Sequence, residues 1–272
     1  MIKLKYVIYI LLGILQGFTE PLPISSSGHL RLFKEVFNTN MLNDLNFEIF
    51  VNFGSFVAIL LIFFPDIVKL IKSFFTYIFN KKKRKETYND FKYCMLILVG
   101  SIPVGIMGAL FKENIENALS IKLLGVAFLI TAISLFLVKN VNGKKEDKDI
   151  TYKDALIIGL LQMVALCPGI SRSGIVLVGC LLCSLKRDSA LKYTFMLYFP
   201  VSVASMGLGV LDFIETGTSS ELLLPYILGM IAAGFVTYFS YIWLSNLVKK
   251  GKLWKFSIYC LILSIFIFIY FR

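Results

Sequence analysis

The chain has 272 residues, of which 57% are hydrophobic and only 17% are charged. That balance excludes an ordinary water-soluble domain and places the chain among polytopic membrane proteins, where this length suits roughly six to eight spans of about 20 residues. The net charge of +11 would suit a nucleic-acid partner, but the basic residues gather in short loops between apolar runs. Membrane topology explains that distribution better, and we expect no nucleic-acid partner.

Six apolar runs are long enough to cross a bilayer, and two further apolar regions are interrupted midway. The crossing segments are predicted at 47–64, 92–111, 121–138, 190–210, 223–246 and 254–271. The mixed segment 66–80 is predicted to be a separate interfacial helix that leads into the basic loop "KKKRK". The interrupted regions, 6–35 and 152–186, contain Pro, Gly and Ser at membrane depth, and we expect each to be a re-entrant helical hairpin.

The two interrupted regions resemble each other in residue type and in order. "ILQGFTEPLPISSSG" at 14–28 aligns without gaps with "LLQMVALCPGISRSG" at 160–174. Gln16 then pairs with Gln162, an offset of 146 residues (162 minus 16). With one hairpin and three crossings in each half, the second half must be inverted relative to the first.

The sequence therefore predicts an all-α polytopic membrane protein with about six transmembrane helices and two re-entrant helical hairpins. Two inverted-topology repeats, about 1–140 and about 150–272, form a single integral membrane domain. Of the 28 Lys and Arg residues, 20 fall in four loops, at 65–92, 139–153, 186–192 and 247–255. Because cytoplasmic loops carry the excess of Lys and Arg, both termini and the opening of the first hairpin are expected on the outer side.

Each interruption ends one helix and starts another. Prolines stop the incoming helix, and serines are placed to cap the outgoing one: Ser25 or Ser26 in the first break and Ser171 in the second. The outgoing helices then direct free N–H groups and the positive ends of their dipoles toward the middle of the bilayer. Two such termini together with Arg172 predict an anion site that suits phosphate or diphosphate.

Ionisable side chains at this depth cost about 2.5–3.5 kcal/mol each on insertion scales, so they indicate function or internal pairing. Arg172 can clamp two phosphate oxygens, or it can pair with Glu20. Glu20 lies one helical turn after Gln16, and the two can hold a divalent cation, handle protons or serve a structural role. His29, the only histidine, lies three residues after Ser26; it can act as a base, as an acid on a leaving oxygen, or as a structural group.

Three stretches carry a resemblance to a known family. "LQGFTEPLPISSSGHL" resembles the motif (E/Q)-x-x-x-E, followed by a proline and S-S-x-G-H, of the undecaprenyl-diphosphate phosphatases, also called bacitracin-resistance proteins. "ALCPGISRSG" resembles their second signature, P-G-x-S-R-S-G, and "FEIFVNFGSFVAILLIFF" at 47–64 resembles their segment F-E-x-x-x-Q-x-G. The resemblance covers essentially the whole chain.

Such a resemblance implies a multi-pass enzyme of the bacterial cell membrane. It would hydrolyse undecaprenyl diphosphate to the monophosphate lipid carrier at the outer side, so that the carrier returns to peptidoglycan synthesis. The implied partners are a prenyl diphosphate lipid and the bilayer, and a homo-oligomer is an open alternative.

The resemblance also implies roles for single residues. Ser26 would be the nucleophile or a phosphate ligand, and His29 its base or an acid for the leaving group. Glu20 with Gln16 would assist in metal or proton handling, and Arg172 would hold the diphosphate. Further substrate contacts are expected from Ser25, Ser27, Ser171, Ser173 and Glu48.

The family is associated with Mg²⁺ or Ca²⁺, and Glu20 is the expected metal ligand. Gln16 stands where many members have Glu, which removes one negative ligand. Pro21, Asn52 and Val176 also depart from the family pattern, and these changes bear on metal dependence and on substrate preference.

Two alternatives to a lipid diphosphate phosphatase remain open from the sequence. A transporter or flippase for polyprenyl phosphates would suit an inverted-repeat architecture, and a catalytically degenerate relative would keep only a structural role. The halves differ, however: Leu166 stands in the second where the first has Glu20, and Ser26 stands in the first where the second has Arg172. That division of labour, with His29 close to Ser26, favours catalysis.

Overall fold

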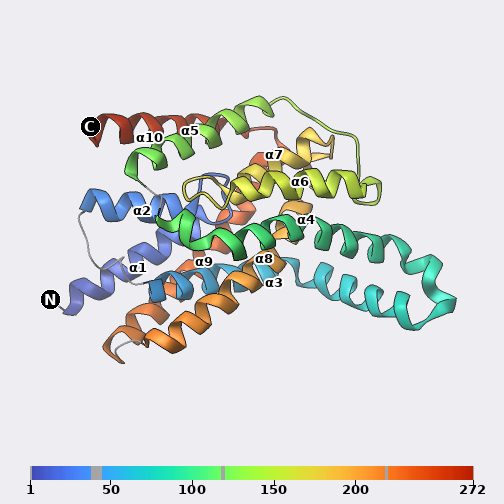
Figure 1. Ribbon diagram of the computed structural model, residues 1–272, viewed down its shortest axis with the longest axis horizontal. Helices are drawn as coiled ribbons and strands as arrows, with labels where there is room; N and C mark the ends of the chain where they lie inside the picture. The colour runs from blue at the N-terminus through green and yellow to red at the C-terminus, as the bar shows by residue number, and fades with distance from the viewer. Residues whose placement is uncertain (1, 38–44, 118–119, 218–219, 272) are drawn as a thin grey trace.

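The structure, a computed structural model, describes residues 2–37, 45–117, 120–217 and 220–271, which form helices and loops without a β-strand. The α-helices are α1 (Ile2–Thr19), α2 (Ser26–Phe37), α3 (Leu45–Phe79), α4 (Arg84–Asn117), α5 (Ile121–Leu137), α6 (Tyr152–Val164), α7 (Arg172–Leu182), α8 (Arg187–Thr216), α9 (Ser220–Lys249) and α10 (Trp254–Tyr270) (Figure 1). Two 3-10 helices, Lys81–Lys83 and Asp147–Asp149, lie in loops.

The predicted all-α polytopic membrane fold is confirmed. Within the described ranges, α3, α4, α8 and α9 are long and apolar enough to cross a membrane by length and composition. The other two predicted crossings, α5 and α10, have 17 residues each, at the lower end of the range that spans a bilayer. These two helices pack along each other, and Ser257 and Ser264 of α10 donate hydrogen bonds to the carbonyls of Ala132 and Gly125.

Helix α3 corrects one expectation, because 66–80 is not a separate interfacial helix. The helix continues through Pro65 to Phe79. The beginning of α4 runs beside this extension, where Asp90 binds Lys69 and Ser73 and where the ring of Phe91 stacks on Tyr77. These contacts support the helix beyond the proline, and the resulting hairpin projects past the other helices (Figure 1).

The first helix of each half packs against the fourth helix of the other half: α1 lies on α9, and α6 lies on α4. Both crossings bring glycines into backbone contact. A Cβ on Gly13 would lie 2.2 Å from the carbonyl oxygen of Gly229, and one on Gly159 would lie 2.5 Å from that of Gly100. Gly13 and Gly159 are 146 positions apart (159 minus 13), the same offset as the two aligned breaks. The inverted repeat over 1–140 and 150–272 stays a prediction, and these matched contacts support it.

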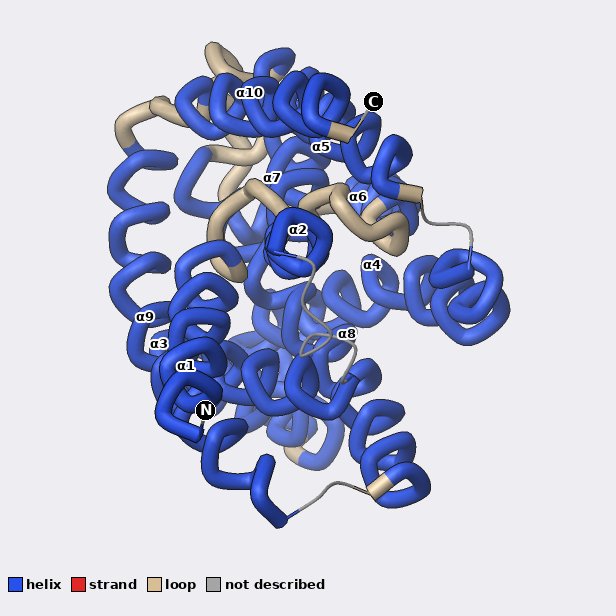
Figure 2. The backbone as a smooth tube through the Cα atoms, turned by 90° about the vertical axis from the view of Figure 1, so that its left-hand side faces the viewer, coloured by secondary structure: helices blue, strands red, loops and turns tan. Residues whose placement is uncertain are grey.

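The two short helices that follow the breaks differ in burial: α7 lies inside the protein, and α2 buries Gly28, His29, Leu30 and Leu32. Helix α7 has 11 residues, about 17 Å at 1.5 Å per residue, which is too short to cross a bilayer core of roughly 30 Å. Every residue from Gly174 to Leu181 is buried, against α5, α6 and α8. Helix α2 contacts α1 and α5, and Figure 2 shows it almost end-on between α1 and the pair of α5 and α10.

Candidate active site

The first break separates α1 from α2 and is closed by hydrogen bonds from its own serine and threonine. At the end of α1, Thr19 Oγ1 donates a hydrogen bond at 2.7 Å to the carbonyl of Leu15, one turn earlier. Ser25 has a φ of 67°, and its hydroxyl accepts a hydrogen bond from the Gly28 N–H at 3.3 Å. Of the two serines expected to cap α2, the cap is therefore Ser25. Its left-handed backbone costs about 1–3 kcal/mol, which the surrounding contacts must offset.

The second break repeats this arrangement between α6 and α7. Gly169 supplies the left-handed residue, with a φ of 98°, and Ser171 caps α7 by accepting from the Gly174 N–H at 3.0 Å. The expected cap at Ser171 is confirmed. The Ser171 N–H in turn donates to Thr131 Oγ1 of α5 at 3.3 Å.

The two breaks touch each other. Ser173 at the start of α7 donates a hydrogen bond to the carbonyl of Leu22 in the first break at 3.0 Å. A Cβ on Gly28 would lie 3.0 Å from the Cα of Gly169, which leaves no room for a side chain between the breaks. The first N–H groups of α2 and α7, which have no partner within a helix, therefore lie in one neighbourhood that attracts anions.

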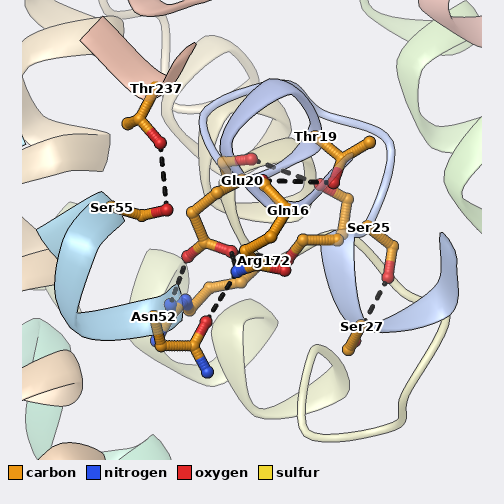
Figure 3. A network of polar contacts seen from close by, with 12 residues as sticks. Gln16, Thr19, Glu20, Ser25, Ser27, Asn52, Ser55, Arg172 and Thr237 are labelled. Carbon is orange, nitrogen blue, oxygen red and sulfur yellow. Dashed lines mark hydrogen bonds and ion pairs between the residues drawn. The ribbon is translucent and has the colours of Figure 1, made fainter. Parts of the chain in front are cut away.

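Glu20 is the centre of the polar network between the breaks. Its Oε2 accepts hydrogen bonds from the Ser26 hydroxyl and from Gln16 Nε2, the latter at 3.0 Å. Its Oε1 accepts from Arg172 Nη2 at 3.3 Å. Gln16 also donates to Asn52 Oδ1 of α3 at 2.6 Å. Figure 3 shows the side chains of Gln16 and Glu20, at the end of α1, meeting Asn52 of α3 and Arg172 of α7.

Arg172 makes one of the two contacts that its position suggested, the ion pair with Glu20. The guanidinium pairs with Glu20, whose side chain is 9% exposed, and it lies 4.8 Å from the ring centroid of Tyr198 on α8. The arginine side chain is nevertheless 31% exposed. Since a guanidinium has five N–H donors, the single bond to Glu20 leaves donors for an anion at the same place.

His29 has partners other than the serine hydroxyls. Its Nδ1 lies 2.7 Å from the carbonyl oxygen of Ser25, and its Nε2 lies 2.8 Å from the hydroxyl of Tyr259 on α10. The edge-to-face contact with Phe128 of α5 holds the ring from a third side. The hydroxyl of Ser26 is bonded to Glu20 instead, so the carboxylate is the proton acceptor that this serine contacts.

The remaining predicted residues lie around this centre. The hydroxyls of Ser25 and Ser27 are 3.5 Å apart, and those of Ser171 and Ser173 are 3.3 Å apart, so each break carries one such pair. Glu48 lies on α3, one helical turn before Asn52. The sequence did not indicate Tyr198 or Tyr259, because each is one of several aromatic residues in an apolar helix and nothing distinguishes it from the others.

The donor set between the breaks fits a hard divalent cation. Glu20 offers carboxylate oxygens, and Gln16 Oε1 is buried without a hydrogen-bond partner, although nearly all buried polar atoms have one. The described residues contain no group of three or more His, Cys, Asp or Glu that could hold a metal ion by themselves. Mg²⁺ commonly binds one or two protein carboxylates and completes its shell with substrate phosphates and water, which suits this arrangement.

Comparison with known proteins agrees with the motifs at both breaks. Residues 9–266 match the family model "Bacitracin resistance protein BacA". The chain is 41% identical over 264 residues to "Undecaprenyl-diphosphatase 1" of Bacillus licheniformis, which covers 96% of this chain and 97% of the relative. It is 40% identical to "Undecaprenyl-diphosphatase 2" of Bacillus thuringiensis, with 96% of each chain covered, and to "Undecaprenyl-diphosphatase" of Oceanobacillus iheyensis, with 96% of this chain and 95% of the relative covered. The chain therefore belongs to the bacitracin resistance protein BacA family.

Proposed function

We propose that this protein is a membrane phosphatase that hydrolyses undecaprenyl diphosphate to undecaprenyl phosphate. The observation that carries the proposal is the cluster of Glu20, Ser26 and Arg172 where two helix N-termini meet. It joins a proton acceptor, a hydroxyl and a cation at an anion-attracting place. The names of the relatives supply the substrate, and the multi-pass membrane fold is consistent with a lipid substrate.

The substrate's diphosphate binds between the breaks. The N-termini of α2 and α7 meet where Ser173 binds the Leu22 carbonyl, and Arg172 lies in the first turn of α7, so helix N–H groups and guanidinium donors are available to the phosphates there. Arg172 exchanges its contact with Glu20 for the phosphate oxygens. This exchange releases Glu20 Oε1 from the arginine, while Oε2 stays on the Ser26 hydroxyl and can take its proton.

The chemical step follows from the bond between Ser26 and Glu20. Glu20 accepts the proton of the Ser26 hydroxyl, and the serine oxygen attacks the terminal phosphorus. The bond from that phosphorus to the bridging oxygen breaks, and undecaprenyl phosphate leaves with its negative charge held by Arg172. Glu20 passes its proton to the departing undecaprenyl phosphate and then takes a proton from the water that attacks the phosphoserine. It returns this proton to the serine oxygen, which restores the hydroxyl as inorganic phosphate leaves.

We further propose that Glu20 and Gln16 Oε1 hold a divalent cation, Mg²⁺ or Ca²⁺, together with the substrate. Such a cation would supply charge neutralisation at the diphosphate. The buried, unpartnered Gln16 Oε1 supports this proposal. In the protein without the cation, Gln16 Nε2 orients Glu20 toward Ser26.

We place the protein in the bacterial plasma membrane, with the first hairpin opening to the outer side. The concentration of 20 Lys and Arg residues in four loops supports this orientation. Single cysteines at 81–85 should react with a membrane-impermeant maleimide only after the cells are permeabilised. Labelling of intact cells at those positions would overturn the orientation.

Phosphate release in detergent micelles tests the function directly. A detergent micelle does not separate two compartments, so a flippase would show no activity in it. The comparisons give the transporter alternative no support. We expect purified protein with a C55 prenyl diphosphate and Mg²⁺ or Ca²⁺ to release one phosphate per lipid. A chelator should abolish the release. No release with any divalent cation would overturn the proposal.

A further inference from the structure

The hydrogen bond between His29 and Tyr259 joins positions 230 residues apart and lies outside the cluster of Glu20, Ser26 and Arg172. The bond connects α2, which starts at the first break, to α10, near the C-terminal end of the chain. Its donor and acceptor can be assigned from chemistry alone.

The partner of Nδ1 fixes the tautomer of His29. The carbonyl oxygen of Ser25, 2.7 Å away, can only accept a hydrogen bond, so Nδ1 must carry a proton. In a neutral imidazole Nε2 is then an acceptor, and the Tyr259 hydroxyl at 2.8 Å is the donor. Removing the Tyr259 hydroxyl therefore removes the hydrogen bond that holds the imidazole ring at Nε2.

The carbonyl that His29 Nδ1 contacts belongs to Ser25, whose backbone conformation is strained. Ser25 adopts a φ of 67°, which a residue with a Cβ rarely adopts, and it directly precedes Ser26. The bond from His29 Nδ1 to this carbonyl stabilises the strained turn, and the turn directs Ser26 toward Glu20. The orientation of the serine therefore depends on the imidazole, and the orientation of the imidazole depends on the tyrosine.

Helix α10 is a fixed support for this chain of contacts. Ser257 and Ser264, on either side of Tyr259, anchor α10 to the backbone of α5. Helix α5 in turn packs Phe128 against the His29 ring and accepts the Ser171 N–H of the second break through Thr131. The pair of α5 and α10 thus supports both breaks.

We propose that Tyr259 is a positioning residue for the reaction: it donates to His29 Nε2, keeps the ring in the orientation in which Nδ1–H binds the Ser25 carbonyl, and so holds Ser25 and Ser26 in place. This inference rests on the proposed phosphatase function for its kinetic consequence, but its structural part does not. The role of His29 in it is to orient the turn, and proton transfer from Ser26 belongs to Glu20.

The single histidine permits a spectroscopic test. Full-length protein labelled with ¹⁵N-histidine and purified through a tag without histidine gives ring signals from His29 alone. We expect the Nδ1–H tautomer in the wild type, and a changed Nε2 signal or a mixture of tautomers in Tyr259→Phe. The control is Tyr270→Phe, which removes an exposed hydroxyl from the same helix. An Nε2–H tautomer in the wild type, or a Tyr259→Phe spectrum equal to the wild type, would overturn the assignment.

Kinetics in micelles test the consequence. Tyr259→Phe should lower kcat by about threefold to tenfold, as expected for the loss of one neutral hydrogen bond, with KM nearly unchanged. Tyr270→Phe should match the wild type. Equal turnover in both variants would refute the positioning role even if the ¹⁵N signals differ. Failure of the wild type to release phosphate would refute the proposed function, and the spectrum would still decide the tautomer.

Discussion

The hydroxyl of Ser26 donates its hydrogen bond to Oε2 of Glu20, six residues earlier and across the first helix break. The other carboxylate oxygen binds Arg172, which lies 152 positions further along the chain. One carboxylate therefore connects the Ser26 hydroxyl in the first half of the chain to the Arg172 guanidinium in the second half. The first two predictions concern these two bonds.

Replacing Glu20 by Gln should lower kcat by about 10²- to 10⁴-fold, the range for loss of a general base. The amide keeps the size of the side chain but cannot take the proton from Ser26. Ser26→Ala should be at least as inactive, and Thr19→Ser, on the same turn of α1, serves as the control because it keeps the bond to Leu15. If the turnover of Glu20→Gln stays within threefold of the wild type, the carboxylate takes no part in the chemical step.

Replacing Arg172 by Lys should raise KM for the prenyl diphosphate by about 10- to 100-fold, as expected for loss of a charge-assisted hydrogen bond worth about 1.5–3 kcal/mol. An ammonium keeps the charge but lacks the planar fork that matches phosphate oxygens. Initial rates against substrate concentration in micelles separate KM from kcat. An unchanged KM would show that the fork does not hold the substrate.

Tyr198 should matter through its ring, because the Arg172 guanidinium lies over that ring. For a partly exposed arginine such as Arg172, a contact of this kind is worth about 0.5–2 kcal/mol. We expect Tyr198→Leu to raise KM by about 2- to 30-fold and Tyr198→Phe, which keeps the ring, to raise KM less. In an Arg172→Lys background the leucine substitution should have a smaller effect. If the leucine substitution raises KM equally in both backgrounds, the Tyr198 ring does not act through Arg172.

Gly159→Ala should destabilise the contact between α6 and α4, since its Cβ would lie 2.5 Å from the Gly100 carbonyl oxygen. Overpacking of this kind costs about 1–3 kcal/mol. Gly105→Ala on α4 is the matched control, because no atom lies within 4 Å of its added Cβ. Thermal unfolding in detergent should show a lower midpoint for the first variant and an equal or higher midpoint for the second. An unchanged unfolding midpoint for Gly159→Ala would show that α6 and α4 can move apart to admit the methyl group without a loss of stability.

Asp154 at the start of α6 should make stability depend on pH. Burial opposes its charge, but hydrogen bonds from Lys145, at 2.8 Å and 2.9 Å, and from Thr151 outweigh burial and lower the pKa of Asp154 below its ordinary 3.8. A lowered native pKa adds stability that is fully present above about pH 4 and is lost as the pH falls through the native value.

Asp154→Asn should therefore lower the unfolding midpoint at pH 7, and the difference from the wild type should shrink as the solution is acidified toward pH 3. Asp188→Asn, whose parent side chain is 71% exposed, should show little change at either pH. If the difference in midpoint between Asp154→Asn and the wild type stays constant with pH, the charge of the Asp154 carboxylate does not stabilise the start of α6.

Much of the site could be predicted because its parts are local. The serines and prolines of each break lie within a few residues of one another, so caps and helix ends follow from short-range rules. Alignment of the breaks also placed Arg172 near Glu20. The extension of α3 beyond Pro65 was missed, because its support comes from α4, which the proline itself does not reveal.

The partners of His29 were missed for a different reason. Spacing on a helix places Ser26 and His29 one turn apart, but side chains on a helix lean toward its N-terminus. Ser26 is in the first turn, so its hydroxyl extends across the break to Glu20, whereas His29 folds back onto the Ser25 carbonyl. Its second partner, Tyr259, comes from the last helix, and no local pattern marks such a contact.

The most direct test of a single site shared by the two breaks is a double-mutant cycle on Glu20 and Arg172, measured as phosphate release from a prenyl diphosphate. Glu20→Gln and Arg172→Ala should each reduce kcat/KM by about 100-fold or more, and the double variant should lose little beyond the worse single variant, because residues that act as a unit are strongly non-additive. Losses that multiply fully, or normal release from Arg172→Ala, would show that the breaks do not form one catalytic site.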